Sequence, residues 1–231
     1  ELKFLVGFFY FSGISELYDS LKANPDVELK ILVGLDVDFL NRDLVEYAYG
    51  SNQSDEAKLN GFFNSIRKSI NSDSFDSKEF YEQVRFFINL IQNDKLLIRK
   101  TFNPNHSKLY LFKFNNHQII RKNLFITGSS NLTRRGISTQ EEFNVEISDY
   151  GFSDAEKYFD ELWEREVKIN EVELAKKKLI EIIENETLIK EITPFEAYCL
   201  ILKSFLDTFE HKSLKTYVIE LLKKNGYKQY R

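Results

Sequence analysis

Two buried apolar runs near the start of the chain, separated by one short helical stretch, limit its fold more than any other feature. Residues 3–11 (KFLVGFFYF) and residues 27–35 (VELKILVGL) are dense in aliphatic and aromatic side chains, which favours buried β-strands. Residues 13–23 between them are expected to form a helix, which Pro25 ends. Two strands joined by a helical crossover lie parallel in one sheet, so the chain opens as an α/β domain.

The rest of the chain contains a predicted helical insertion, a group of strands and a helical tail. Residues 39–93 repeat apolar side chains at helical spacing. Four strand-like runs follow, at residues 95–101, 107–114, 121–127 and 141–148. From about residue 153 the pattern is helical to the end of the chain. We therefore predict the fold class α/β, with a mixed central β-sheet flanked by helices in residues 1–166, and a small all-helical unit in residues 167–231.

The charge of the chain is unevenly distributed. The 32 basic and 36 acidic residues give a net charge of −4, yet no Asp or Glu occurs between Lys95 and Gln140. Nine basic residues lie in this acid-free segment, namely Lys95, Arg99, Lys100, Lys108, Lys113, Arg121, Lys122, Arg134 and Arg135. A local excess of positive charge on an acidic background attracts phosphate-bearing ligands to one place. The alternative is a solvated face whose acidic partners lie elsewhere in the fold, and charge alone leaves both interpretations open.

Composition excludes several classes of protein. No apolar run approaches the roughly 18 residues that cross a bilayer, and the helical stretches carry mixed charge, so we expect no membrane partner and a cytoplasmic location. The single cysteine, Cys199, rules out an internal disulfide and offers no cysteine cluster for zinc. The chain opens directly on an apolar run and ends without a closing signal, which suggests a piece of a longer protein.

A histidine and a lysine lie two residues apart at the start of one predicted strand. Side chains two apart share one face of a strand, so His106 and Lys108 are expected to project together. The same face is expected to continue into the core through Tyr110, Phe112 and Phe114. A lysine on such a central strand needs a carboxylate, a phosphate or solvent, because an unpaired buried ammonium is costly.

The next predicted strand ends in a turn, Gly128-Ser129-Ser130-Asn131, that is rich in uncharged hydrogen-bond donors. Backbone N–H groups, hydroxyls and a carboxamide are donors that can bind a phosphate. A single strand histidine, or a single turn of this composition, is more often structural than functional. Found together inside the acid-free segment, the two features indicate a phosphate-binding site.

The combination resembles the sequence signature of the phospholipase D superfamily, in which His-x-Lys on a strand is followed one strand later by Gly-Ser-x-Asn. His106 and Lys108 match the first motif, and Ser129 and Asn131 match the second. The chain departs from the longest pattern of the superfamily at one position. The aspartate expected five residues after the lysine is replaced by Lys113.

Nuclease branches of the superfamily supply a carboxylate from a glutamate on the strand after Gly-Ser-x-Asn, and the resemblance implies the same here. Glu142, eleven residues past Asn131, stands at the matching position, and Glu141 is its competitor. Neighbouring strand residues point to opposite faces, and the sequence does not say which face is inward. We favour Glu142, because Asn144 completes the Glu-x-Asn spacing of such branches.

The resemblance implies a two-step phosphodiester cleavage that requires no metal and no cofactor. One histidine attacks phosphorus, a second protonates the leaving oxygen, and water then hydrolyses the phosphohistidine. Lys108, Ser129 and Asn131 would hold the phosphoryl oxygens, and Glu142 would orient the imidazole. The chain has three histidines, and only His106 lies in the motif, so a composite site in a homodimer is expected.

Nucleic acid, either DNA or RNA, is the expected substrate. Arg134 and Arg135 just after the turn, together with Lys122, are candidate contacts to the phosphate backbone. Residues 192–205 (ITPFEAYCLILKSF) and the ending GYKQYR resemble the segment that joins a phospholipase D-like nuclease domain to the motor of bacterial helicase-like proteins. The rival hypothesis is a binding and dimerisation module of little or no activity, which the substitution at Lys113 keeps open.

Overall fold

The computed structural model describes residues 1–35, 54–72, 78–114, 123–148 and 150–187, and beyond them residues 194–195, 198–199 and 201–202. The chain divides into two compact units, Glu1–Ile189 and Lys190–Arg231. The first unit contains the sheet and both sequence motifs of the candidate site. In the second unit, the described residues are helical.

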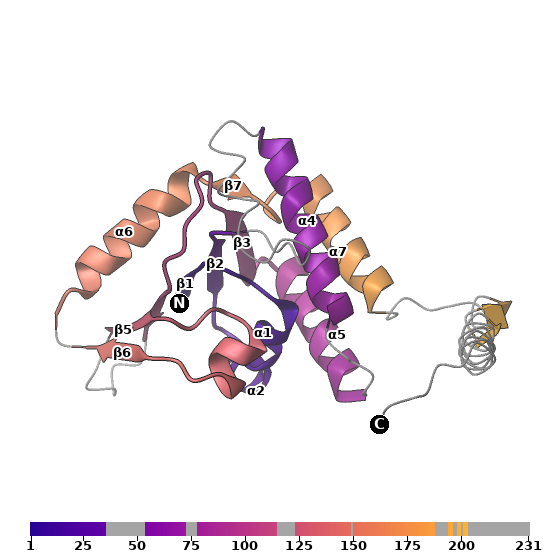
Figure 1. Cartoon of the computed structure of the whole chain (residues 1–231), viewed down its shortest axis with the longest axis horizontal. Coiled ribbons are helices and arrows are strands. Elements are labelled where there is room, and N and C mark those ends of the chain that lie inside the picture. Colours follow the sequence, from indigo (N-terminus) through magenta and orange to yellow (C-terminus); the bar gives the residue numbers. More distant parts are fainter. Residues whose placement is uncertain are drawn as a thin grey trace, which may run out of the picture. The chain divides into compact units, whose positions relative to one another are not determined.

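Among the described residues, seven strands form one sheet at the centre of the first unit (Figure 1). The strands are β1 (Leu2–Val6), β2 (Leu29–Val33), β3 (Leu96–Lys100), β4 (Leu109–Lys113), β5 (Asn123–Gly128), β6 (Asn144–Ile147) and β7 (Val167–Lys168). Their order is β6-β5-β4-β1-β2-β3-β7. The β1–β2 and β2–β3 pairs are parallel and the other pairs are antiparallel. The predicted mixed sheet is confirmed, including its parallel opening pair.

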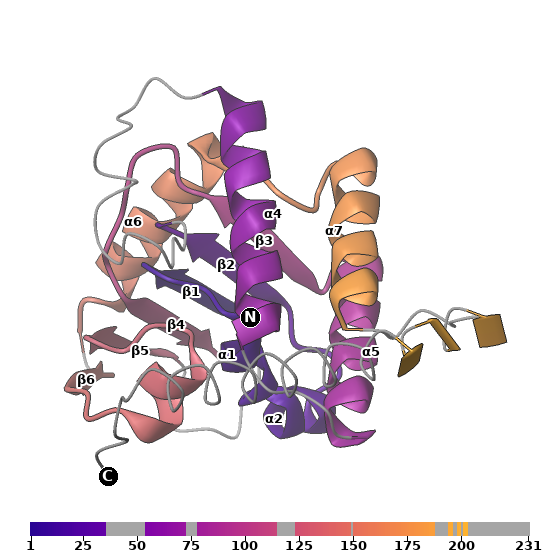
Figure 2. The same ribbon diagram turned by 45° about the vertical axis from the view of Figure 1, so that its right-hand side comes forward.

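Helices cover both faces of the sheet. They are α1 (Phe11–Ser15), α2 (Tyr18–Ala23), α4 (Asp55–Ser72), α5 (Lys78–Gln92), α6 (Phe152–Arg165), α7 (Glu173–Glu186) and a short π-helix, η2 (Arg135–Thr139). Helices α4, α5 and α7 lie on one side of the sheet and α6 on the other (Figure 2). The predicted helical insertion is observed as α4 and α5, and the remainder of residues 39–93 lies outside the described residues.

Strand β4 is apolar on both faces and joins the two parts of the core. Tyr110 and Phe112 pack against the larger cluster, under α4 and α5, while Leu109 and Leu111 belong to the smaller cluster under α6. This alternation is what a central strand requires. The prediction that Phe114 continues the row into the core is wrong. Its side chain is 37% exposed, because β4 ends one residue earlier.

Helix α7 folds with the sheet rather than apart from it. It packs against α4 and α5, and its Leu179, Ile182 and Ile183 are buried in the larger cluster. The first compact unit consequently extends past the boundary predicted after residue 166. Most of the predicted all-helical unit beyond α7 falls on residues outside the described part of the chain.

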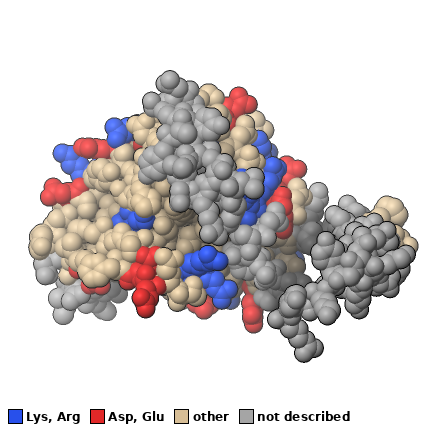
Figure 3. Space-filling model, viewed as in Figure 1, with Lys and Arg blue, Asp and Glu red and all other residues tan. Residues whose placement is uncertain are grey.

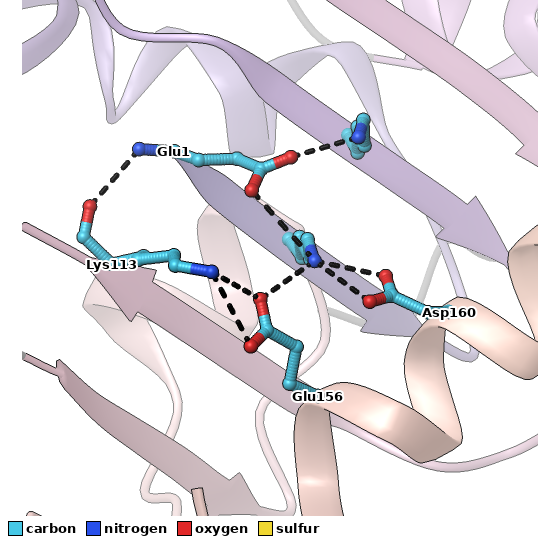
Figure 4. A network of polar contacts seen from close by, with 6 residues as sticks. Glu1, Lys113, Glu156 and Asp160 are labelled. Atoms are coloured by element: carbon cyan, nitrogen blue, oxygen red, sulfur yellow. Dashed lines mark hydrogen bonds and ion pairs between the residues drawn. The ribbon is translucent and has the colours of Figure 1, made fainter. Parts of the chain in front are cut away.

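One lysine is buried in the smaller part of the core, beneath α6. The Nζ of Lys3 on β1 lies 2.8 Å from Glu156 Oε1 and 2.9 Å from Asp160 Oδ1, both on α6. Lys113 at the end of β4 joins the same carboxylate of Glu156 at 3.1 Å (Figure 4). Burial alone would lower the pKa of Lys3, but the hydrogen bonds with Glu156 and Asp160 outweigh it and raise that pKa. These ion pairs tie α6 to the sheet.

Candidate active site

His106 lies in the segment that joins β3 to β4, and this segment is held against the ends of neighbouring strands. The Asn105 N–H donates to the Gly34 carbonyl at 3.2 Å, and a Cβ on Gly34 would lie 1.7 Å from the Asn105 carbonyl oxygen. Only glycine allows this approach. The Phe102 N–H donates to the buried carboxylate of Glu166. Anchored on both sides of β3, the segment places His106 at a fixed position next to β4.

The ammonium of Lys108 is in direct contact with His106. Its Nζ lies 3.0 Å from Nδ1 and 2.9 Å from Nε2 of the ring, and it donates to the His106 carbonyl at 2.7 Å. Lys108 is 6% exposed, whereas His106 is open to solvent. The motif therefore places a buried cation against an accessible imidazole.

Both side chains of the motif are shifted toward their neutral forms. Burial lowers the pKa of His106, and the charge of Lys108 lowers it further. Burial also lowers the pKa of Lys108, an effect that the carboxylate of Glu142 opposes. The imidazole is thus favoured in its neutral form, in which one ring nitrogen carries a lone pair. That is the state that a nucleophilic histidine requires.

The turn after β5 brings Ser129 next to a carboxylate of the following segment. Ser129 Oγ donates to Glu142 Oε2, and the Ser129 N–H donates to the Phe143 carbonyl at 3.1 Å. Glu142 also acts electrostatically on Lys108, whereas Glu141 is exposed. Of the two competing glutamates, Glu142 is the one that lies with the motif residues. Its described hydrogen bond is with Ser129, so the role of orienting the imidazole stays a prediction.

Three further side chains hold Lys108, β4 and the turn after β5 in place. The Tyr110 hydroxyl donates to the Ser130 carbonyl at 2.7 Å, and Asn144 Nδ2 donates to Ser130 Oγ at 2.7 Å. Thr127 Oγ1 donates to the Lys108 carbonyl at 2.9 Å. The turn is therefore fixed from β4 on one side and from β6 on the other.

Asn131 is positioned by the two residues that follow β1, which sequence-based prediction did not include in the site. Its Oδ1 accepts a hydrogen bond from the Phe8 N–H at 2.9 Å, and Gly7 lies against both Asn131 and His106. The feature of the sequence that could have indicated this contact is Gly7. A glycine directly after a buried strand marks a place where another part of the chain approaches closely.

The basic residues of the acid-free segment do not form one surface in the described part of the chain. Four of them pair with acidic residues elsewhere in the sequence, namely Lys95 with Asp26, Arg99 with Glu171, Lys113 with Glu156 and Arg134 with Glu16. Arg135 is exposed at the start of η2, and Lys122 lies outside the described residues. On the face shown in Figure 3, Lys and Arg side chains form small patches interleaved with acidic ones. The positive charges of these four residues are therefore balanced by acidic side chains from other parts of the fold.

Within the described ranges, no group of three or more His, Cys, Asp and Glu side chains is arranged to hold a metal ion. The same part of the chain has no helix that is long and apolar enough to cross a membrane. The polar groups gathered near His106 are instead an ammonium, hydroxyls, a carboxylate and a carboxamide.

Two solved structures are similar to this chain at low sequence identity. The phospholipase D family member Nuc from Salmonella typhimurium is 13% identical, with a TM-score of 0.35, over 72% of this chain and 80% of that chain. Phosphatidylserine synthase from Haemophilus influenzae Rd KW20 is 14% identical, with a TM-score of 0.41, over 83% of this chain and 41% of that chain. Comparison with curated protein sequences finds no match.

The family comparison covers most of the sheet and the whole candidate site. Residues 4–163 match the family described as "Cardiolipin synthase, PLD-like domain". The matched residues include His106 and Lys108 just before β4 and the turn from Ser129 to Asn131 after β5. Since the match spans more than half of the chain, this protein belongs to the family of phospholipase D-like domains.

Proposed function

We propose that this chain is a metal-independent phosphodiesterase that cleaves nucleic acid through a phosphohistidine on His106. The observation that carries the proposal is the contact between the His106 ring and the buried ammonium of Lys108. An accessible neutral imidazole is a nucleophile. A fixed cation with neutral donors nearby stabilises the charge that grows on the phosphoryl oxygens in the transition state.

The proposed reaction has two steps. His106 attacks phosphorus, and an N–P bond forms while the P–O bond to the leaving group breaks and a second histidine protonates the leaving oxygen. Water then attacks the phosphohistidine, the second histidine takes a proton from that water, and the N–P bond breaks. Lys108, Ser129 and Asn131 would hold the non-bridging oxygens through both steps.

The second histidine is proposed to come from another copy of the chain. His106 is the one histidine among the described residues, and the full sequence has three. A twofold dimer would bring the imidazole of a second His106 to the opposite side of the same phosphate. Light scattering at assay concentrations is expected to report a dimer. A strictly monomeric mass in an active preparation would contradict the composite site.

Nucleic acid is the proposed substrate class because the phosphate-binding turn leads directly into two exposed arginines. Arg134 and Arg135 follow Asn131 within a few residues and both are exposed, although Arg134 also pairs with Glu16 at 3.3 Å. Arginines in this position can contact neighbouring phosphates of a polymer. On the resemblance of residues 192–205, we further propose that the chain is the nuclease part of a longer helicase-like or restriction-type DNA-processing protein.

A nuclease assay on DNA and RNA in excess chelator tests this proposal. The wild-type chain is expected to cleave under these conditions, and His106→Ala is expected to be inactive. His211→Ala is the matched control, because it removes a histidine outside the motif, and it is expected to cleave at the wild-type rate. Cleavage by His106→Ala at the wild-type rate would contradict the mechanism.

A catalytically weak module for nucleic-acid binding and dimerisation is the second candidate. It is favoured by one departure from the superfamily pattern, since Lys113 replaces the expected aspartate and its side chain pairs with Glu156 on α6. This candidate predicts that the wild-type chain binds DNA or RNA in a gel-shift experiment but cleaves neither. Turnover in chelator would exclude it.

A further inference from the structure

The chain beyond β1 runs alongside the turn that carries Asn131. Phe9 and Leu132 form a parallel bridge, and the Tyr10 N–H donates to the Leu132 carbonyl at 3.1 Å. The two residues between β1 and this bridge are therefore held next to Asn131. They come from the first ten residues of the chain, far in sequence from either motif.

A backbone group of this segment fixes the carboxamide of Asn131. The Phe8 N–H donates to Asn131 Oδ1 at 2.9 Å. A carboxamide without such a partner can rotate by half a turn and exchange its oxygen and nitrogen, because the two atoms have nearly the same shape. Since a donor engages the oxygen here, Nδ2 is left with its two N–H bonds for an acceptor. A neutral donor of this kind suits a phosphoryl oxygen.

Two further contacts link the segment to His106. A Cβ on Gly7 would lie 3.1 Å from Asn131 Oδ1 and 3.1 Å from His106 Cδ2, which is shorter than most real Cβ contacts. The Phe8 ring meets the imidazole of His106 edge-on, with ring centroids 6.1 Å apart. A side chain at position 7 would therefore push one or both motif residues away from their present places.

We propose that Gly7 and Phe8 are positioning residues of the active site. Gly7 leaves the space in which His106 and Asn131 approach each other, and Phe8 orients both of their side chains. Neither residue offers a group that attacks phosphorus or transfers a proton, so their effect is exerted through His106 and Asn131. The claim that these two residues assist a reaction rests on the proposed function. Their effect on the placement of His106 can be measured without any substrate.

The test is NMR spectroscopy of the 15N-labelled imidazole groups in the full chain, compared among wild type, Gly7→Ala and Gly151→Ala. Gly151 is the matched control, because its φ of 76° makes alanine unfavourable while its added Cβ would approach only the Phe125 ring, at 3.7 Å. The ring signals of His106 are expected to shift in Gly7→Ala alone. In an active preparation, kcat of Gly7→Ala is expected to fall about tenfold with KM changed less than about twofold, because a small displacement of the nucleophile affects the chemical step.

A second variant keeps the inference testable if Gly7→Ala does not fold. Phe8→Ala retains the N–H that binds Asn131 but removes the ring beside His106. Because burial lowers the pKa of His106 in the wild-type chain, removing this ring is expected to raise that pKa, which an NMR titration measures. An unchanged His106 signal in folded Gly7→Ala would overturn the inference. Where Gly7→Ala fails to fold, an unchanged pKa in Phe8→Ala would overturn it.

These outcomes separate the positioning role from the proposed function. If the wild-type chain cleaves no nucleic acid but the His106 signals shift as expected, the proposed function fails and the positioning of His106 stands. If the wild-type chain is active, shifted His106 signals with an unchanged kcat in Gly7→Ala would overturn the positioning role and leave the proposed function standing.

Discussion

Removing one hydroxyl, with Tyr110→Phe, is expected to weaken both the fold and the site. The Tyr110 hydroxyl donates to the Ser130 carbonyl at 2.7 Å, and its ring packs edge-on against Phe4 at 5.0 Å between centroids. Phenylalanine keeps the ring and removes only the hydrogen bond, which is worth about 1 kcal/mol in a partly buried place. Burial and then the charge of Glu142 raise the pKa of Tyr110, so the hydroxyl stays protonated over the working pH range.

Urea denaturation measures this loss of stability. With a slope of about 2 kcal/mol per molar urea, a loss of about 1 kcal/mol lowers the midpoint by about 0.5 M. Tyr18→Phe is the control, because the Tyr18 hydroxyl accepts its hydrogen bond from Lys22 on an exposed helix, and no measurable change is expected. Cleavage in chelator is expected to slow in Tyr110→Phe alone, since the turn after β5 loses one of its supports. Equal midpoints and equal rates for the two variants would refute the reasoning.

Three other substitutions test separate parts of the account. Lys113→Asp restores the residue of the superfamily pattern but adds a carboxylate beside those of α6, so stability is expected to fall by up to about 1 kcal/mol in urea denaturation without any gain in cleavage. Lys108→Gln removes a cation that lowers the pKa of His106, so NMR titration is expected to show that pKa rising. Neutralising Arg134 and Arg135 together is expected to reduce the salt dependence of nucleic-acid binding by about one unit of slope per lost phosphate contact.

Each of these has an outcome that would contradict it. Faster cleavage by Lys113→Asp would mean that position 113 contributes to the site after all. A pKa of His106 that falls or stays constant in Lys108→Gln would mean that the ammonium does not act on the ring. Binding that is equally sensitive to salt with and without the two arginines would place the nucleic-acid surface elsewhere.

Most of the strands were predictable because burial leaves a direct imprint on the sequence, whereas the two-residue strand β7 lies in a stretch that was predicted to be helical. A central strand must be apolar on both faces, and β4 shows this in Tyr110 and Leu111, which face the two halves of the core. The end of a strand leaves no such imprint, since it depends on where the neighbouring strands stop pairing. Phe114 is as apolar as its predecessors but follows the last residue of β4 and is exposed.

The candidate site was predictable only where its geometry is local. The contact between His106 and Lys108 was expected from their spacing of two in the sequence. The prediction that both lie on the strand is wrong, because β4 begins only at Leu109. The position of Glu142 beside the turn depends on the pairing of β5 with β6, where Gly128 lies opposite Asn144, and that register is a property of the fold. The closeness of Gly7 depends likewise on a contact between distant parts of the chain.

The difference between local and long-range contacts also explains why the acid-free segment, Lys95 to Gln140, does not form one positive surface in the described part of the chain. The absence of Asp and Glu from this segment can be read directly from the sequence. The ion pairs that neutralise four of its nine basic residues join positions far apart in the sequence. Arg99 pairs with Glu171, and Arg134 pairs with Glu16. Charge patterning along a sequence therefore overstates the positive surface whenever the fold brings acidic residues to it.

The covalent intermediate tests the central claim most directly. Substrate is mixed with the wild-type chain in chelator, the reaction is quenched in alkali at short times, and peptides are analysed by mass spectrometry for added phosphate. The account predicts a substrate-derived phosphoryl group on His106, with none in His106→Ala, because only a nucleophilic histidine acquires phosphorus on its ring. Cleavage that proceeds without any phosphoryl group on His106, or with one on a different residue, would contradict it.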